Sequence, residues 1–211
     1  MTTVTGTQGP MGGQSPTVTG PAATSEIVTV ADPAPLGLAA FGITTLLLSV
    51  INAGWVGAAA TPIVLAVAIP YGGLGQILAG MWAFRRGNTF AATAFTSYGA
   101  FWISYFLLVE FAPGIKDATV ISPIIGTYLL SWGIFTAYMF LASLAGSRAV
   151  QAVFLLLAAT FVLLAIGAYA TSDTWTHIGG DFGLATTVAA LYASFADVLN
   201  ANFKRTILPT N

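Results

Sequence analysis

The stretch LGLAAFGITTLLLSVINAGW, residues 36–55, decides the fold of this chain. It holds no charged side chain, and it is long enough for a helix to cross a bilayer, which takes about 20 mostly apolar residues. More stretches of this kind follow, and we expect spans at Leu36–Trp55, Pro62–Phe84, Phe90–Phe111, Pro123–Leu144, Ala149–Thr171 and Ile178–Leu199. The sequence therefore predicts an all-α, polytopic membrane protein with six transmembrane helices per protomer.

The composition indicates that most of the protein surface faces lipid. Of 211 residues, 56% are hydrophobic and only 6% are charged, whereas a soluble domain carries about 25% charged residues. The net charge of −1, without a basic tract, argues against nucleic acid as a partner. The chain has no cysteine and a single histidine, His177, so it can form neither a thiolate site nor a multi-histidine metal site alone. It also lacks a phosphate-loop motif and a convincing Ser-His-Asp set, and we expect no enzyme activity, cofactor or metal.

The basic residues give the spans a direction, because Lys and Arg favour the cytoplasmic side. With six spans, the face that carries the N-terminus also carries most of the basic residues, which are Arg85, Arg86, Arg148, Lys204 and Arg205. Lys116 lies alone on the other face. We therefore expect both termini in the cytoplasm, a disordered tail rich in Thr, Gly and Pro over residues 1–31, and a six-helix membrane domain over residues 32–209.

The tryptophans and the histidine are expected mainly near the ends of the spans. We interpret most tryptophans as an interfacial belt, namely Trp55, Trp82, Trp132 and Trp175. Trp102 lies deeper and is interpreted as packing between helices. His177 is expected to be exposed in an outer loop.

Polar side chains inside a span need a partner or water. In the first span, Phe41, Thr45, Leu48 and Asn52 recur every three or four residues and so share one stripe of a helix, with Thr44 beside it. Such a stripe is typical of a pore face. Ordinary polar contacts between helices are the alternative, and for Asn52 the two interpretations weigh about the same.

Three other spans contribute one notable residue each. Gln76 in the second span either bonds across the bundle or faces a pore. Tyr98 in the third span lies about 13 Å deep at 1.5 Å per residue, so its hydroxyl needs a partner. Leu157 lies at a similar depth in the fifth span and, taken alone, is ordinary core.

Four segments, in matching order from about Pro33 to Pro209, carry a family resemblance. They are Pro33-Ala34-Pro35-Leu36-Gly37-Leu38 with Phe41-Gly42; Tyr71-Gly72-Gly73 with Gln76; Gly87-Asn88-Thr89-Phe90 through Tyr98-Gly99; and Val198-Leu199-Asn200 with Arg205-Thr206-Ile207-Leu208-Pro209. On these segments the chain resembles the acetate uptake transporter family, the succinate–acetate permeases. It departs from the family pattern at Asp32, where the family has Asn, and at Asp197, where the family has Glu.

The resemblance implies a protomer of the plasma or inner membrane that assembles as a hexamer, with a path for acetate and related small carboxylates in each protomer. It implies a hydrophobic constriction midway along the path, formed by Phe41, Tyr98 and Leu157. It marks an entrance motif at the cytoplasmic mouth, Asp32-Pro33-Ala34-Pro35-Leu36-Gly37, and leaves a charge role for Asp197 open. We hypothesise polar vestibules on both sides of the constriction, with Thr44, Thr45, Asn52, Gln76, Asn88 and Thr96 as the polar residues of the path.

Two other functions stay open at this point. Asp32-Pro33-Ala34 is similar to half of an aquaporin signature, but that fold needs two Asn-Pro-Ala half-helices and the sequence holds no second copy. A non-transporting membrane protein for signalling or assembly is the other alternative, and the polar stripe of the first span argues against it. For a transporter, the residues do not separate a channel from a proton symporter, nor rank acetate, propionate, succinate and bicarbonate.

Overall fold

The computed structural model describes residues 2–3, 30–111, 114–115 and 117–211. Most of the predicted tail, residues 1–31, and Lys116 therefore lie outside the described residues. The elements are α1 (Ala34–Asn52), η1 (Ala58–Ala60), α2 (Thr61–Val67), η2 (Ala68–Gly75), α3 (Gln76–Arg85), α4 (Thr89–Phe111), α5 (Ala118–Ser143), α6 (Arg148–Ala170) and α7 (Asp173–Phe203). By length and composition, 6 helical stretches of the described chain can cross a membrane, and the second of them, Ala58–Arg85, joins η1, α2, η2 and α3. The prediction of an all-α protein with six spans is confirmed.

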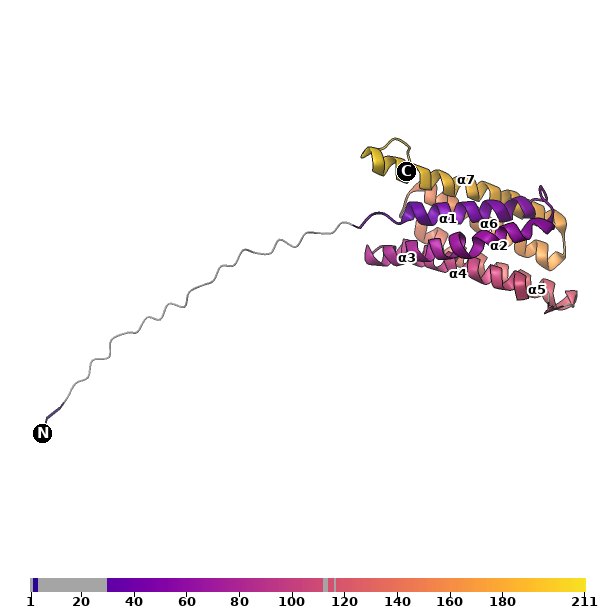
Figure 1. Cartoon of the computed structure of the whole chain (residues 1–211), viewed down its shortest axis with the longest axis horizontal. Helices are drawn as coiled ribbons and strands as arrows, with labels where there is room; N and C mark the ends of the chain where they lie inside the picture. The colour runs from indigo at the N-terminus through magenta and orange to yellow at the C-terminus, as the bar shows by residue number, and fades with distance from the viewer. Residues whose placement is uncertain (1, 4–29, 112–113, 116) are drawn as a thin grey trace.

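The helices lie side by side along one axis (Figure 1). α7 packs along both α1 and α6, α6 packs along α5, and α3 packs along α4. The start of α1 and the end of α7 lie at the same end of the bundle (Figure 1). The first, third and fifth predicted spans correspond to α1, α4 and α6, and all three begin at this end.

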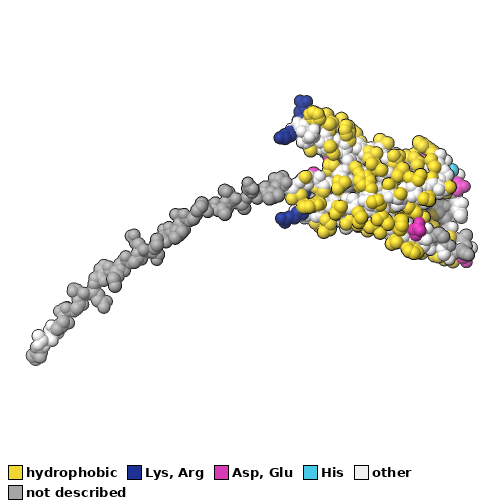
Figure 2. All heavy atoms as spheres, in the orientation of Figure 1, with side chains coloured by type: hydrophobic (Ala, Val, Ile, Leu, Met, Phe, Trp, Pro, Cys, Tyr) yellow, Lys and Arg dark blue, Asp and Glu magenta, His cyan; other side chains and the backbone are white. Residues whose placement is uncertain are grey.

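On the face shown in Figure 2, the charged side chains of the described residues lie toward the two ends of the bundle, and apolar side chains cover the flank between them. The Lys and Arg side chains of the described residues gather at the end where α1 begins, because Arg85 ends α3, Arg148 begins α6 and Lys204 follows α7. Many large apolar side chains on the flank are exposed, such as Ile63 at 60% and Val188 at 70%. In water such a surface would be unfavourable, so it faces lipid. The basic end is the side that we expect in the cytoplasm.

Two spans start five residues before their predicted starts, the largest differences of the six, because the helix is longer than the apolar run. α5 begins at Ala118 rather than at Pro123, since Asp117 caps it by accepting hydrogen bonds from the backbone N–H of Thr119 at 2.9 Å and from its hydroxyl at 2.6 Å. These hydrogen bonds, the side-chain one first, lower the pKa of the Asp117 carboxyl. α7 begins at Asp173 rather than at Ile178, so His177 lies in a helix and not in a loop, although it is exposed as expected.

The tryptophan prediction is confirmed for Trp102 and wrong for Trp132. Trp102 is 1% exposed and packs between helices, whereas Trp55, Trp82 and Trp175 are exposed, as a belt requires. Trp132 lies in the middle of α5, where it is half-buried against a cluster of aromatic side chains. Trp132 lies nine residues, or about two and a half turns, from Pro123 even in the predicted span, so the belt interpretation placed it too near a span end.

Candidate functional site

Two cavities lie inside the bundle, one toward each end. The inner cavity, of about 320 Å³, is on the basic side and its lining includes Asn88 and Asp197. The outer cavity, of about 270 Å³, lies toward the other end and its lining includes Asn52 and Thr176. Both linings are mainly apolar, with a few polar side chains placed among rings and methyl groups. Such a composition is typical of small-molecule sites.

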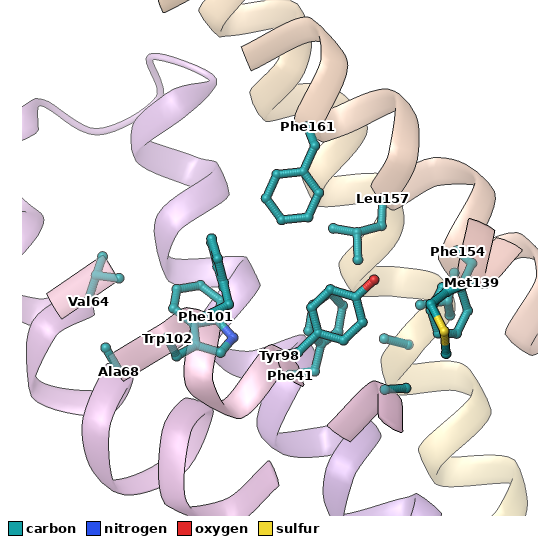
Figure 3. Close-up of a cluster of buried hydrophobic side chains, with 13 residues drawn as sticks. Phe41, Val64, Ala68, Tyr98, Phe101, Trp102, Met139, Phe154, Leu157 and Phe161 are labelled. Atoms are coloured by element: carbon teal, nitrogen blue, oxygen red, sulfur yellow. The ribbon is translucent and has the colours of Figure 1, made fainter. Parts of the chain in front are cut away.

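The cavities meet at Phe41 and Leu157, which line both of them. Tyr98 lines the inner cavity and its ring centroid lies 5.7 Å from that of Phe41. Figure 3 shows the three side chains together in the buried aromatic cluster. They come from α1, α4 and α6, and each lies about two to two and a half turns into its helix, which places them at a similar depth. The structure thus brings together the three residues that we call the neck: Phe41, Tyr98 and Leu157.

The neck tyrosine has the partner that its depth requires. The hydroxyl groups of Tyr98 and Thr136 on α5 lie 2.9 Å apart, and both residues are buried. Aromatic rings surround the rest of the phenol, with centroids at 5.3 Å for Phe135, 6.2 Å for Trp132 and 6.1 Å for Phe154. Apart from the Tyr98 hydroxyl, the surroundings of the neck tyrosine are therefore apolar, and its ring makes edge-to-face and tilted contacts with rings of α1, α5 and α6.

Three buried polar atoms at the cavities have no hydrogen-bond partner among the described residues. Gln76, which lines the inner cavity, donates from Nε2 to the Gly72 carbonyl at 2.8 Å and leaves Oε1 unpaired. Thr45 Oγ1 and Trp102 Nε1 are unpaired in the same sense, and both residues line the outer cavity. In Figure 3 the indole nitrogen is on the side of the Trp102 ring toward Tyr98 and Phe41. A buried polar atom left unpaired is costly, so these atoms are suited to bind water or a solute.

Not every predicted path residue reaches a cavity. Asn52 lines the outer cavity, and Asn88 lines the inner one while its side chain caps α4 by accepting the backbone N–H of Ala91 at 3.0 Å. Thr44 is fully buried against the second span. Its side chain packs directly on Gly72, so closely that a Cβ added to Gly72 would lie 2.8 Å from it. Thr96 contacts Gly80 in the same way. A path role for these two threonines stays a prediction, and their positions favour the packing alternative instead.

The entrance motif fixes the start of α1 at the mouth of the inner cavity. Asp32 accepts the backbone N–H of Ala34 at 3.0 Å and forms an ion pair with Arg86 at 3.3 Å. The Pro35 carbonyl accepts the Ser194 hydroxyl at 2.7 Å, which ties α1 to α7. Gly37 has the Phe95 ring where a side chain would stand, so only glycine fits there. In this motif Ala34 lines the cavity, while Pro33 precedes the helix and Leu36 is exposed on the flank.

Asp197 is the acidic side chain at the inner cavity. It projects from α7, is half-buried, and lines the cavity together with Asn88 and Ser147. Among the residues that the structure describes, it has no Lys or Arg partner within ion-pair distance. The position agrees with a charge role at the mouth, which stays a prediction.

Sequence reasoning missed the contact between Thr136 and Tyr98, and it did not place Trp102 in the lining of the outer cavity. A signal was present for the helix face, because Tyr128, Trp132 and Phe135 recur every three or four residues along α5 and face α4. No such signal exists for Thr136, which lies 38 residues from Tyr98 in the chain.

A bundle of six apolar helices, with an internal cavity on each side of an apolar neck, defines the class of multi-pass membrane proteins. The chain matches the GPR1/FUN34/yaaH family over residues 14–210, and it belongs to that family. It is 44% identical over 181 residues to the succinate-acetate/proton symporter SatP of Escherichia coli K12, a match that covers 85% of this chain and 95% of SatP. It is 38% identical over 196 residues to acetate permease A of Emericella nidulans, covering 85% of this chain and 65% of that protein. A solved structure of the bacterial acetate channel SatP superposes with a TM-score of 0.80 at 43% identity, covering 87% of this chain and 100% of that chain.

Proposed function

We propose that the protein is a membrane channel or transporter for acetate and related short monocarboxylates, with passage controlled at the neck. The observation that carries the proposal is that Phe41 and Leu157 line both cavities, so one apolar barrier separates two partly polar chambers. The names of the relatives, an acetate permease and a succinate-acetate/proton symporter, support the substrate class. They are transporters and channels by name, which also supports a function other than catalysis.

The neck would act through the cost of removing water from a charged group. A short carboxylic acid is mostly ionised at neutral pH, since the reference pKa of Glu is about 4.3. Carbon rings and a leucine side chain replace none of the hydrogen bonds between the carboxylate and water, and an apolar constriction of this kind gates by excluding water. A short acid crosses most easily, because its methyl end tolerates the apolar contacts and little chain has to pass.

The two cavities offer different polar groups to a waiting solute. In the outer cavity, the Trp102 N–H and the Thr45 hydroxyl are donors for a carboxylate oxygen. In the inner cavity, Gln76 Oε1 is an acceptor, which suits water or the hydroxyl of a protonated acid. Passage of the neutral acid, or coupling to a proton, is consistent with this difference. Asp32, paired with Arg86, adds no net charge of its own at the mouth.

The remaining features of the proposal come from the family resemblance. We assign transport to residues 32–209 and a tail to residues 1–31, and we place the protein in the plasma or inner membrane with both termini in the cytoplasm. We further propose a homo-hexamer in which each protomer holds its own path. The exposed apolar flank agrees with contacts to lipid and to neighbouring protomers alike.

The test is uptake of labelled acetate into proteoliposomes across a pH series, with and without a proton uncoupler. We expect saturable uptake that rises as the pH falls, since more acid is then neutral. Uptake that the uncoupler abolishes indicates a symporter, and uptake that follows only the acetate gradient indicates a channel. Swelling with water or glycerol but no acetate flux supports an aquaporin-like pore, and no flux of any short acid from a stable oligomer supports a non-transporting protein. Either of the last two results contradicts the proposal.

A further inference from the structure

A hydroxyl on a fourth helix holds the neck tyrosine in place. Thr136, on α5, is fully buried, and its Oγ1 lies 2.9 Å from the hydroxyl of Tyr98 on α4. Thr136 is not among the described residues that line the two cavities. It therefore touches the path only through Tyr98.

The direction of this hydrogen bond follows from the number of protons available. Thr136 Oγ1 lies 2.7 Å from the Trp132 carbonyl one turn earlier in α5, and a carbonyl can only accept. The threonine hydroxyl has one proton, which goes to Trp132, so toward Tyr98 it offers only lone pairs. Tyr98 is consequently the donor, and its proton points into α5 and away from the path.

Among the residues that the structure describes, the Tyr98 proton has no second acceptor inside the neck. The neighbouring rings of Phe41, Phe135 and Phe154 are hydrocarbon, with centroids between 5.3 and 6.1 Å from that of Tyr98. Without Thr136, the phenol would keep a buried and unsatisfied donor, which is unfavourable. Because Tyr98 already lines the inner cavity, the nearest relief is to turn the hydroxyl toward water or solute there.

We propose that Thr136 is a positioning residue that sets the specificity of the neck: by accepting the Tyr98 proton, it keeps the neck free of hydrogen-bond donors and favours solutes that present an apolar end. This inference rests on the proposed transport function. It predicts that the loss of the Thr136 hydroxyl makes the neck more polar without removing any side chain that lines it.

α5 carries a matched control for this arrangement. Thr127 Oγ1 lies 2.9 Å from the Tyr169 hydroxyl and donates to the Pro123 carbonyl at 2.9 Å, so it makes the same pair of hydrogen bonds. Thr127 is exposed and is not among the described residues lining either cavity. Thr127→Val therefore removes an equivalent pair of bonds far from the neck.

The first experiment compares propionate and acetate fluxes in proteoliposomes for the wild type, Thr136→Val, Thr136→Ser and Thr127→Val. We expect Thr136→Val to lower the propionate-to-acetate flux ratio about fourfold, because a hydrated phenol no longer favours the one extra methylene of propionate, whose apolar transfer is equivalent to about 0.8 kcal/mol. Thr136→Ser should restore the ratio, and Thr127→Val should not change it. In a Tyr98→Phe background, Thr136→Val should add no further change, because no phenol proton remains. An unchanged ratio in Thr136→Val, or an equal change in both backgrounds, overturns the inference.

The second experiment reads the hydrogen bond without transport. The infrared C–O stretching band of Tyr98, assigned by its loss in Tyr98→Phe, depends on whether the phenol donates a hydrogen bond and to what. We expect the band to shift in Thr136→Val and to stay in place in Thr127→Val. An unshifted band with normal acetate flux overturns this inference alone. A wild type that moves no short acid overturns the proposed function and the neck role with it, whatever the band shows.

Discussion

Replacing Leu157 by Ala should join the two cavities. The Leu157 side chain is 3% exposed and is a wall of both chambers, of about 320 and 270 Å³. In the wild type, a carboxylate that crosses the neck gives up hydrogen bonds to water that the neck does not replace, and one such unmade bond costs about 1–3 kcal/mol. If the wider neck lets one water stay bound, the rate of passage rises about fivefold to 150-fold.

The assay is the initial rate of labelled acetate uptake into proteoliposomes, normalised to the amount of folded protein. Normalisation matters because a Leu→Ala change in a packed interior costs about 2–5 kcal/mol of stability. Leu155→Ala is the control, since Leu155 lies on the same helix but is 54% exposed on the flank. We expect succinate flux to gain more than acetate flux in Leu157→Ala, because a second carboxylate loses more water at the neck. Acetate uptake equal in Leu157→Ala and Leu155→Ala would refute the reasoning.

Three further changes test other parts of the structure. Trp102→Phe removes the unpaired N–H from the outer cavity and should raise the half-saturation concentration for acetate about fivefold, the equivalent of one hydrogen bond of about 1 kcal/mol; an unchanged value argues against binding there. Gly72→Ala would place a Cβ 2.8 Å from Thr44 and Trp102, and such overpacking costs about 1–3 kcal/mol, so the thermal midpoint in detergent should fall. A midpoint equal to that of the wild type would mean that this contact can relax freely. Asp32→Asn breaks the ion pair with Arg86 but keeps an oxygen to cap α1, so we expect a stability change below about 1 kcal/mol, and a larger loss at low salt would contradict it.

The sequence predicted the spans well because a membrane-spanning helix requires a continuous run of about 20 mostly apolar residues, and such a run can be read directly from the sequence. It predicted their ends less well, since a helix continues beyond the bilayer wherever a cap allows it. Asp117 starts α5 before Pro123, and the polar first turns of α7 carry His177 out of the expected loop. Neither extension changes the apolar runs from which the spans were predicted.

The meeting of Phe41, Tyr98 and Leu157 followed from motifs and from equal depth in three helices that start at the same end. Side-chain partners were harder to predict, because they depend on how each helix is rotated and how closely its neighbours approach. Thr44 shares the polar character of Thr45, yet Gly72 lets the second span approach so closely that Thr44 is sealed away from the outer cavity. The hydrogen bond between Thr136 and Tyr98 depends on how α5 packs beside α4, which the sequence alone does not specify.

The central claim, that one apolar neck separates two chambers, is tested most directly by thiol accessibility. The chain has no cysteine of its own, so Thr45→Cys reports only on the outer cavity and Val153→Cys only on the inner one, each about one turn from a neck residue. In right-side-out and inverted vesicles, an anionic, membrane-impermeant thiol reagent should modify each cysteine from its own side only, and from both sides once Leu157→Ala is added. Equal modification of Thr45→Cys from both sides with Leu157 intact would contradict the account.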